Sequence, residues 1–392
     1  MNHKRMCPVC GSPNHSLLFR QQFATLSGVA LLKGYDVAAC DGCGFTFAQG
    51  LPDQAAFDSY YKEVSKYENP DQTLSSAMAE RFEESLSFML LVTGLKEKSF
   101  LKLSFADIGC ATGNFLRFLK EKGAQDITGI DPSRACVDFL NGNNIRAFQS
   151  SVFHMDNKIK YDFIRFNAVL EHIEDVNQAI ESLKGKLSPN GYLYISVPEV
   201  RGFEHLNQCP FQEFSVEHIN YFSANSLRQL MARHGLNAVK QGEKVNINPW
   251  YSELEMVFRQ DSRCGGIEAG FDSASIDGLK TYIFNNESLE AEVNRKIKVL
   301  AESREPILVW GVGTFTLRQL ACGPLRDCNI TGLVDCNPHY WGKEYRGIPV
   351  LKPVEVPGHE EGILVSSSYA QESICSYIRN SLKAENRLIT IF

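Results

Sequence analysis

Residues 105–133, FADIGCATGNFLRFLKEKGAQDITGIDPS, have the pattern of a strand, a glycine-rich turn, a helix and a second strand that ends in an acidic residue. The apolar run at residues 105–108 predicts a short strand. After the turn, apolar residues recur with the helical period: Phe115, Leu116, Phe118 and Leu119. A second strand is predicted at residues 126–130, directly before Asp131. This order is typical of the first half of a doubly wound α/β sheet, in which ligands bind beyond the carboxyl ends of the strands.

The glycine-rich turn indicates which cofactor such a sheet would bind. It reads Asp107-x-Gly109-x-Ala111-x-Gly113, and asparagine stands where a dinucleotide-binding pattern has its last glycine. An acidic residue before the first glycine suits a cationic amino group, which S-adenosylmethionine carries on its amino-acid moiety. Asp131 can accept hydrogen bonds from both ribose hydroxyls. We therefore predict an S-adenosylmethionine site formed by these residues. A nicotinamide or flavin nucleotide and an empty fold are the alternatives.

The length, composition and charge of the whole chain limit which kinds of protein it can be. The chain has 392 residues, enough for two or three domains, and 44% of them are hydrophobic. The formal net charge of −6 argues against a nucleic-acid polymer as the partner. The N-terminus lacks the apolar core of a secretory signal, and no run approaches the roughly 20 apolar residues of a membrane helix. Most of the 12 cysteines are scattered, which predicts a reducing, cytoplasmic location.

Four cysteines form two tight pairs near the N-terminus. Cys7 and Cys10 are the first C-x-x-C pair, Cys40 and Cys43 are the second, and a glycine follows each pair. Both thiolates of such a turn can face one ion, and four thiolates match a closed tetrahedral structural zinc site. We predict structural Zn²⁺ here, without a catalytic role. Iron is the alternative that four thiolates also accept.

Further candidate site residues follow the predicted strands of the central part of the chain. Phe153 is predicted to form a wall of the adenine pocket, and Asn167 ends the fourth strand, shortly before His172. Beyond the fifth strand lies a compact polar group that contains Glu217, His218 and Tyr221. A histidine with a near-neutral pKa can remove a proton from the acceptor atom, and a neighbouring carboxylate can orient that histidine.

A helical bridge is predicted between the cysteine pairs and the glycine-rich turn. The apolar stripe of its helix, at about residues 74–95, is predicted to pack against the sheet. Tyr67 precedes this helix. It is predicted either to belong to a lid over the cofactor or to be a surface aromatic residue.

Residues 105–198 resemble a class I S-adenosylmethionine-dependent methyltransferase. The resemblance rests on the glycine-rich turn and on three further segments: Gly129-Ile130-Asp131-Pro132-Ser133, Val169-Leu170-Glu171-His172 and Leu187-Ser188-Pro189-Asn190-Gly191. With the cysteine pairs in front, nearly the whole chain resembles the zinc-binding deoxysugar C-methyltransferase family. That resemblance implies a nucleotide-linked sugar as the methyl acceptor.

The family resemblance also implies roles for individual residues. The matching family motif reads Y-H-E-H, and its last histidine is the general base, which implies this role for His218 and a match of Glu217 to the glutamate. An enolate of the sugar would be stabilised by Tyr221 or Tyr67. Ser215-Val216 replace the first two motif residues, and Ala111-Thr112 stand where the family usually has Asn-Asp. Methylation of a hydroxyl or an amine therefore stays open.

The last part of the chain repeats the order of strand, glycine turn, helix, strand and acidic residue. Residues 307–314 contain the second glycine turn, and Asp335 ends the next strand. Thr316 stands at the third glycine of the dinucleotide pattern, so an intact NAD site is not expected. The resemblance implies that this part closes over the sugar nucleotide. A structural or dimerising role is the alternative.

We therefore predict an α/β protein of three parts. These are a zinc-binding module at residues 1–70, a Rossmann-like methyltransferase domain at residues 71–240 and a Rossmann-like substrate-binding domain at residues 241–392. The predicted function is methyl transfer from S-adenosylmethionine to a nucleotide-linked sugar. The alternatives are O- or N-methyl transfer to another small metabolite, a catalytically silent scaffold, and an oxidoreductase that uses the turn at Gly311. The oligomeric state is left open.

Overall fold

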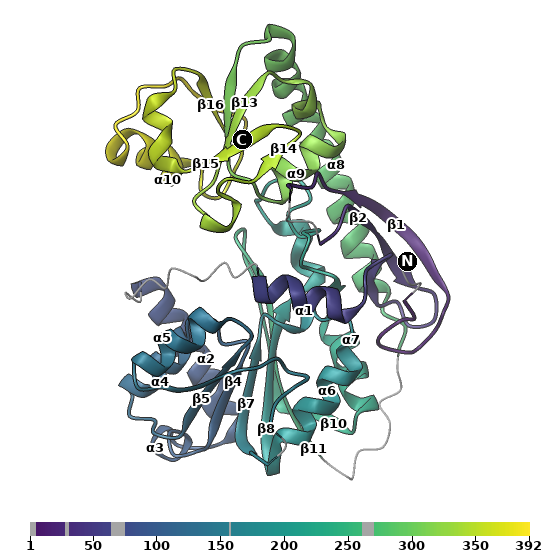
Figure 1. The fold of residues 1–392 in the computed structure, drawn as a ribbon. Coiled ribbons are helices and arrows are strands. Elements are labelled where there is room, and N and C mark those ends of the chain that lie inside the picture. The colour runs from purple at the N-terminus through teal and green to yellow at the C-terminus, as the bar shows by residue number, and fades with distance from the viewer. Residues whose placement is uncertain (1–4, 28–30, 64–74, 157, 261–269) are drawn as a thin grey trace.

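The computed structural model describes residues 5–27, 31–63, 75–156, 158–260 and 270–392, and these residues form three β-sheets with helices around them. Figure 1 shows a seven-stranded sheet in the lower part of the molecule and a six-stranded sheet in the upper part. The N-terminal strands lie at the side, next to a long helix. The predicted α/β class is confirmed.

The seven-stranded sheet has the order β10-β11-β8-β7-β4-β5-β6. Its strands from β8 to β6 are parallel, and β11 and β10 are added antiparallel at one edge. The strands are β4 (Phe105–Ile108), β5 (Ile127–Asp131), β6 (Arg146–Gln149), β7 (Tyr161–Asn167), β8 (Leu187–Pro198), β10 (Leu236–Ile247) and β11 (Ser252–Gln260). The winding direction reverses between β4 and β7, which is the position where α/β sheets bind ligands.

Helices cover both faces of this sheet because successive strand residues point to opposite sides. Phe105 and Phe163 belong to one hydrophobic cluster, whereas their neighbours Ala106 and Ile164 belong to the other. The first face is covered by α2 (Ser76–Thr93), α3 (Glu97–Phe100), α4 (Asn114–Glu121) and α5 (Arg134–Gly142), and the second by α6 (Val176–Lys186) and α7 (Ala224–Arg233).

The four-stranded sheet combines N-terminal strands with one much later segment. Its order is β1 (His15–Gln22), β2 (Gly34–Cys40), β3 (Thr46–Gln49) and β9 (Asn220–Tyr221), all antiparallel. Thr46 lies opposite Tyr221. Helix α1 (Gln54–Glu63) follows β3. The N-terminal sheet is therefore completed by a strand that begins two residues after His218 and contains Tyr221, a member of the predicted catalytic group.

The six-stranded sheet forms the second α/β unit. Its strands are β12 (Ile307–Trp310), β13 (Ile330–Val334), β14 (Glu344–Tyr345), β15 (Ile348–Leu351), β16 (Gly362–Val365) and β17 (Leu388–Thr390), in the order β14-β15-β13-β12-β16-β17. Its helices are α8 (Ser273–Ser303), α9 (Thr314–Cys322) and α10 (Gln371–Ser376). Leu279 of α8 packs in the cluster of the N-terminal sheet, and Ile297 packs in that of the six-stranded sheet. Helix α8 therefore connects these two cores.

Two predictions about segments can be compared with this fold. The proline, asparagine and glycine at residues 189–191 are typical of a turn and predict one before the fifth strand, but these residues belong to the first part of β8. Asn190 has a φ of +68°, and the pairing with β7 is irregular here, so turn-type residues form a bulge inside a strand. The predicted boundary at residue 240 falls within β10, and the other domain bounds stay predictions.

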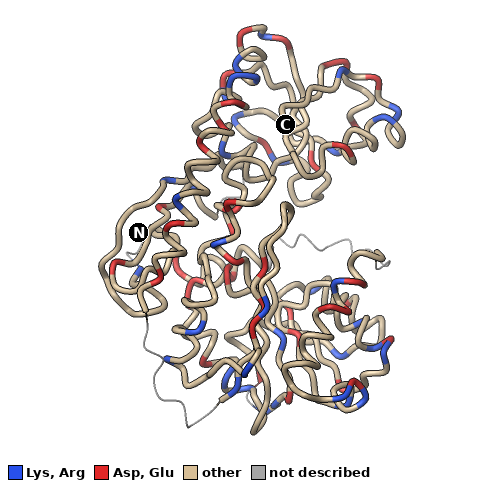
Figure 2. Tube along the Cα trace, turned by 180° about the vertical axis from the view of Figure 1, so that it is seen from behind, with Lys and Arg blue, Asp and Glu red and all other residues tan. Residues whose placement is uncertain are grey.

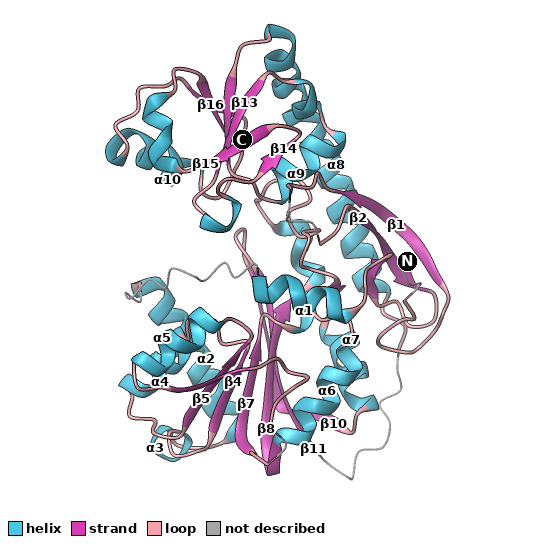
Figure 3. Ribbon diagram, viewed as in Figure 1, coloured by secondary structure: helices cyan, strands magenta, loops and turns pink. Residues whose placement is uncertain are grey.

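Charged residues of both signs are spread over the molecule. Figure 2 shows that lysine and arginine residues are interspersed with aspartate and glutamate residues over the whole trace. Within the described ranges, we find no helix with the length and hydropathy that a membrane crossing needs. In Figure 3 the upper unit lies beyond the end of the lower sheet at which the parallel strands β4, β5, β7 and β8 have their carboxyl ends.

Candidate active site

The glycine-rich turn between β4 and α4 is built from left-handed residues at alternate positions. Gly109 has a φ of +73°, Ala111 of +49° and Gly113 of +66°. A Cβ atom on Gly109 would lie 2.5 Å from a methyl carbon of Val169, and one on Gly113 would lie 2.2 Å from Leu140. Both glycines are therefore required by backbone conformation and by close packing.

Asp131 at the end of β5 holds this turn in place. Its Oδ2 accepts a hydrogen bond from the Ala111 amide at 2.8 Å, and its Oδ1 accepts one from the Ser133 amide at 2.8 Å. Burial raises the pKa of Asp131, and these two amides oppose the rise. Each carboxylate oxygen keeps a second lone pair, so Asp131 can still accept hydrogen bonds from a ligand.

A cavity of about 1030 Å³ opens at the carboxyl ends of β4, β5 and β7. It is lined by most of the residues that the sequence predicted to bind the cofactor, namely Asp107, Gly109, Ala111, Asp131, Phe153 and Asn167. Gly113 is outside the lining and acts through the shape of the turn. His172 and Glu217 also line the cavity. The predicted cofactor residues and two predicted catalytic residues thus share one site.

The lining also contains residues that the sequence reading missed. Arg81 and Met78 come from α2, Arg165 from β7 and Glu253 from β11. Met78 lies in the helix whose apolar stripe is predicted to pack against the sheet, but its own side chain is exposed at this cavity. One signal was available, because Arg165 is a charged residue within an apolar strand, and such a residue needs a buried partner.

That partner is Asp107. Nη1 of Arg165 lies 3.1 Å from both carboxylate oxygens of Asp107, and both side chains are buried. The guanidinium also stacks 4.4 Å from the ring centroid of Phe115. Burial raises the pKa of Asp107, and Arg165 opposes that rise. The carboxylate that we expected to receive a cationic amino group is therefore already bonded to a cation.

A group of acidic and imidazole side chains lies next to the cavity. Nδ1 of His218 lies 3.5 Å from Oε2 of Glu213, so the carboxylate beside this histidine is Glu213 rather than the predicted Glu217. Glu217 accepts a hydrogen bond from the Tyr60 hydroxyl at 3.1 Å. Burial lowers the pKa of His218, but Glu213 and the other nearby carboxylates outweigh it, so the pKa is raised overall.

His172 connects this group to the cavity. Its Nδ1 lies 2.9 Å from the carbonyl oxygen of Glu217, and its ring contacts that of His218 edge-on, with centroids 5.0 Å apart. The ring of Tyr61, from α1, also contacts that of His172 edge-on, with centroids 6.0 Å apart. Burial raises the pKa of Glu171 to about 7, and His218 opposes this rise. Several groups that can exchange protons near neutral pH are thus gathered in one place.

The two predicted tyrosines have different outcomes. Tyr221 is 1% exposed, and its hydroxyl lies 3.2 Å from that of Tyr35 and 3.1 Å from the carbonyl oxygen of His218. Tyr221 is therefore held inside the protein and is not among the residues that line the cavity. Tyr67 lies outside the described residues. The tyrosines that reach the site are Tyr60 and Tyr61, which the sequence reading did not single out.

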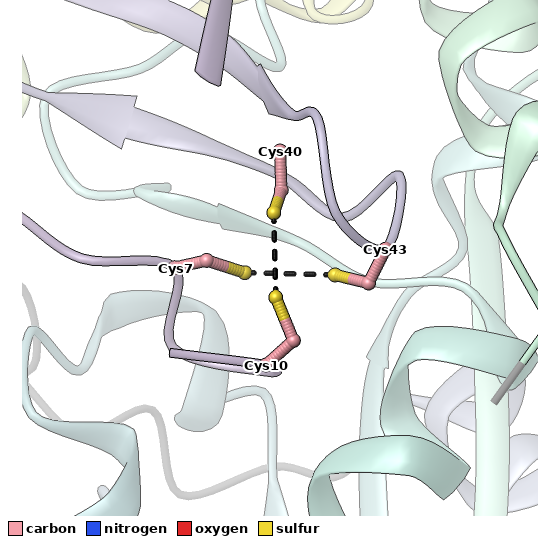
Figure 4. A group of neighbouring side chains, drawn as sticks. All are labelled: Cys7, Cys10, Cys40 and Cys43. Carbon is pink, nitrogen blue, oxygen red and sulfur yellow. Dashed lines mark hydrogen bonds between the residues drawn. The ribbon is translucent and has the colours of Figure 1, made fainter. Parts of the chain in front are cut away.

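The four paired cysteines form one cluster (Figure 4). Sγ of Cys7 lies 3.6 Å from that of Cys43, and Sγ of Cys10 lies 3.4 Å from that of Cys40. A tetrahedral site with metal–sulfur bonds of about 2.3 Å has sulfur–sulfur edges of roughly 3.8 Å, so the spacing fits such an ion. In each pair the amide of the following glycine donates to the carbonyl of the first cysteine.

The second glycine turn repeats the geometry of the first. The Val312 amide donates to Oδ2 of Asp335 at 2.7 Å, and the Asn337 amide donates to Oδ1 at 2.7 Å. The predicted internal parallel between the two units is therefore visible in their hydrogen bonds. The Thr316 hydroxyl lies 2.6 Å from both the Gly311 carbonyl oxygen and the Ser366 hydroxyl.

Comparison with known proteins places the cavity in a methyltransferase domain. Residues 76–241 match the model of a family described as a methyltransferase domain. The C-methyltransferase NovU of Streptomyces niveus is 25% identical over 295 residues, which are 68% of this chain and 67% of that protein. The ubiquinone biosynthesis O-methyltransferase of Rickettsia felis is 31% identical over 101 residues, 24% of this chain and 41% of that protein.

Among solved structures, the magnesium protoporphyrin IX methyltransferase of Synechocystis PCC 6803 with bound S-adenosylmethionine is similar with a TM-score of 0.39. It is 15% identical, and the match covers 54% of this chain and 98% of that one.

Proposed function

We propose that this S-adenosylmethionine-dependent methyltransferase methylates a carbon atom next to a ketone in a nucleotide-linked sugar, with His218 as the general base. The observation that carries the proposal is the contact of His218 with His172, which lines the cofactor cavity. The similarity to a C-methyltransferase supports carbon as the acceptor, and it extends well beyond the methyltransferase domain. The second α/β unit offers a further surface for the nucleotide.

The lining residues fit S-adenosylmethionine as follows. Phe153 and its neighbours would contact the adenine ring, and Asp131 would accept hydrogen bonds from the ribose hydroxyls. The amino-acid end would then lie toward Arg165 and α2. When bound, S-adenosylmethionine supplies an electrophilic methyl group on a sulfonium ion.

The chain's own residues would prepare the acceptor for that methyl group. Neutral His218 accepts the proton from the acceptor carbon, which leaves an enolate. Glu213 then stabilises the imidazolium that has formed. His172 and Tyr61 line the cavity, and the His172 ring contacts the rings of both His218 and Tyr61. The remaining contribution of the enzyme is to hold the two reactants in line.

We further propose that the cysteine cluster holds structural Zn²⁺. Four thiolates leave no open coordination position, so the ion would take no part in the reaction. Cys10 and its partners belong to a segment that contacts the helices covering the methyltransferase sheet, because Arg233 of α7 donates to the Pro8 carbonyl at 3.3 Å. Asn177 of α6 donates to the same carbonyl at 3.0 Å.

A panel of nucleotide-linked keto sugars tests the acceptor. Incubation with S-adenosylmethionine should give a product heavier by one methylene group for at least one member. In deuterium oxide with S-adenosylhomocysteine, the enzyme should exchange the proton at the acceptor carbon, because proton removal precedes methyl transfer. Methylation without any exchange would instead favour an oxygen or nitrogen acceptor. That is the second candidate function, which the similarity to an O-methyltransferase supports.

We expect the pH dependence of catalysis to report the environment of His218. The base must be neutral to accept a proton, so kcat/KM should rise with pH through the raised pKa of His218. Substitution Glu213→Gln removes the carboxylate that favours the charged imidazole, and it should move this acid limb to lower pH. A pH profile of the variant that overlays the wild-type profile would show that another group limits the reaction.

Substitution Asp131→Ala should weaken binding of S-adenosylhomocysteine about 100-fold, because charge-assisted hydrogen bonds to the turn and to the ribose are lost together. Isothermal titration calorimetry measures this loss. Asp138→Ala is the matched control, since Asp138 is exposed on α5 and pairs only with Arg134 within the described residues. Equal affinities of the Asp131 variant and the wild type would place the ribose elsewhere.

A further inference from the structure

One end of the cavity contains two ion pairs, each made of one arginine and one carboxylate. Arg165 is paired with Asp107 at the floor, and Arg81 is paired with Glu253 at the rim. The end of the cavity near Phe153 is instead lined mainly by apolar and hydroxyl side chains. An α-amino acid zwitterion also carries one positive and one negative charge. The charged end is therefore the part of the cavity that suits the amino-acid moiety of the cofactor.

The inner pair is closed to a ligand ammonium group. Both oxygens of Asp107 lie 3.1 Å from one guanidinium nitrogen of Arg165, and the Asp107 side chain is 2% exposed. An ammonium group that approached Asp107 would also approach the guanidinium, which repels it. The stack of Arg165 on Phe115 holds the guanidinium in this position. Asp107 is therefore better placed to orient Arg165 than to bind the cofactor directly.

The outer pair is accessible. Nη2 of Arg81 lies 3.1 Å from Oε2 of Glu253, and the side chains are 53% and 21% exposed. The Ser196 hydroxyl donates to the other oxygen, Oε1 of Glu253, at 2.7 Å, which fixes the carboxylate at the carboxyl end of the sheet. The Arg81 guanidinium rests 4.4 Å from the ring centroid of Tyr251. Both side chains of this pair are held by a neighbour, and the pair is accessible to solvent. A bound zwitterion could therefore replace the one ion pair between Arg81 and Glu253 with two, one to each side chain.

Helix α2 brings Arg81 to this position. Met78, Phe82 and Ser85 line the same cavity and lie on the same helix face as Arg81, at spacings of three and four residues. Glu253 forms the first residue pair between β11 and β8, opposite Pro198 at the carboxyl end of β8. Two separate elements, one helical and one from the antiparallel edge, thus close the charged end.

We propose that Glu253 receives the ammonium group of S-adenosylmethionine and Arg81 its carboxylate, whereas Asp107 positions Arg165. This inference rests on the proposed placement of the cofactor in the cavity. It assigns recognition of the amino-acid end to two residues outside the glycine-rich turn. Specificity for a cofactor with an intact α-amino acid then depends on the pair Arg81–Glu253.

The test compares three ligands by calorimetry: S-adenosylhomocysteine, its analogue without the amino group, and 5′-methylthioadenosine, which lacks the whole amino-acid end. Glu253→Gln should weaken S-adenosylhomocysteine about 30-fold and leave the two ligands without an amino group nearly unchanged. Arg81→Met should weaken both ligands that carry a carboxylate and leave 5′-methylthioadenosine unchanged. The pair Arg81–Glu253 is partly exposed, so both variants should keep the thermal midpoint of the wild type within a few degrees.

Arg134→Met is the matched control, because this exposed arginine of α5 pairs with Asp138 and is not part of the cavity lining. Equal losses for all three ligands in the Glu253 variant, or no loss for S-adenosylhomocysteine, would overturn the assignment. Failure of the wild-type protein to bind both S-adenosylhomocysteine and 5′-methylthioadenosine would instead overturn the placement of the cofactor itself. The two failures are therefore distinguishable.

Discussion

Substitution His218→Asn should lower the rate of methyl transfer by about three orders of magnitude and leave the affinity for S-adenosylhomocysteine unchanged. General-base catalysis contributes this much when a positioned side chain accepts the proton. Asparagine has similar size and keeps hydrogen-bonding capacity, but it cannot accept a proton at neutral pH. The cofactor contacts come from other residues, so binding of the cofactor should not change.

Two measurements make this prediction specific to the base. Single-turnover methyl transfer reports the chemical step, and deuterium exchange at the acceptor carbon reports proton removal alone. Both should fall together in the variant. His205→Asn is the matched control, because this side chain is 60% exposed and lies beyond β8 on a different segment. Retained exchange in the His218 variant would remove His218 from the mechanism and direct attention to His172.

Removal of the proposed zinc ion should have the largest effect on the stability of the protein. Structural zinc sites of small modules contribute about 10–16 kcal/mol of apparent binding free energy at neutral pH. Without the ion, four thiols held within 4.8 Å of one another lose the interaction that gathers them. We expect a chelator such as EDTA, or the substitution Cys40→Ser, to lower the midpoint of denaturant unfolding strongly. Metal analysis of the purified protein should give one zinc per chain.

The loss should extend from the cysteine cluster to the catalytic group. Strand β3 pairs with β9, and the Ile219 amide donates to the carbonyl of Glu171 at 2.9 Å. The metal-free protein should therefore lose amide-exchange protection at residues 217–221 as well as near the cysteines. Cys322→Ser is the control, since this exposed thiol of α9 lies outside the cluster. A chelator-treated protein of unchanged stability would contradict a structural metal.

Sequence reasoning was most successful where the interactions are local. The strands and helix around Gly109 and Gly113 follow from periodicity, and Asp131 follows from its place after a strand. The second unit was found in the same way, from Gly311 and Asp335. In each case the residues that define the feature lie within about 30 positions, so one stretch of sequence carries the pattern.

The parts that escaped prediction depend on contacts between distant segments. The pairing of Arg165 with Asp107 spans 58 positions, and no local pattern shows which charges meet inside a sheet. Glu213 was overlooked as the partner of His218 because Glu217 is nearer in sequence. In the folded chain, however, the Glu213 carboxylate is the one that lies beside the His218 ring. The role of Arg81 and Glu253 required the position of α2 and of the antiparallel edge, which periodicity does not give.

The pairing of β3 with β9 has a consequence for folding during synthesis on the ribosome. Thr46 donates a hydrogen bond to the carbonyl of Tyr221, which is synthesised 175 positions later. Phe45 and Phe47 are fully buried in the folded protein, so these apolar side chains stay exposed to solvent until the intervening chain has been synthesised. Contacts of such long separation form slowly, and exposed apolar strands are prone to aggregate. Overproduction should therefore benefit from slow translation and from chaperones that shield the nascent N-terminal strands.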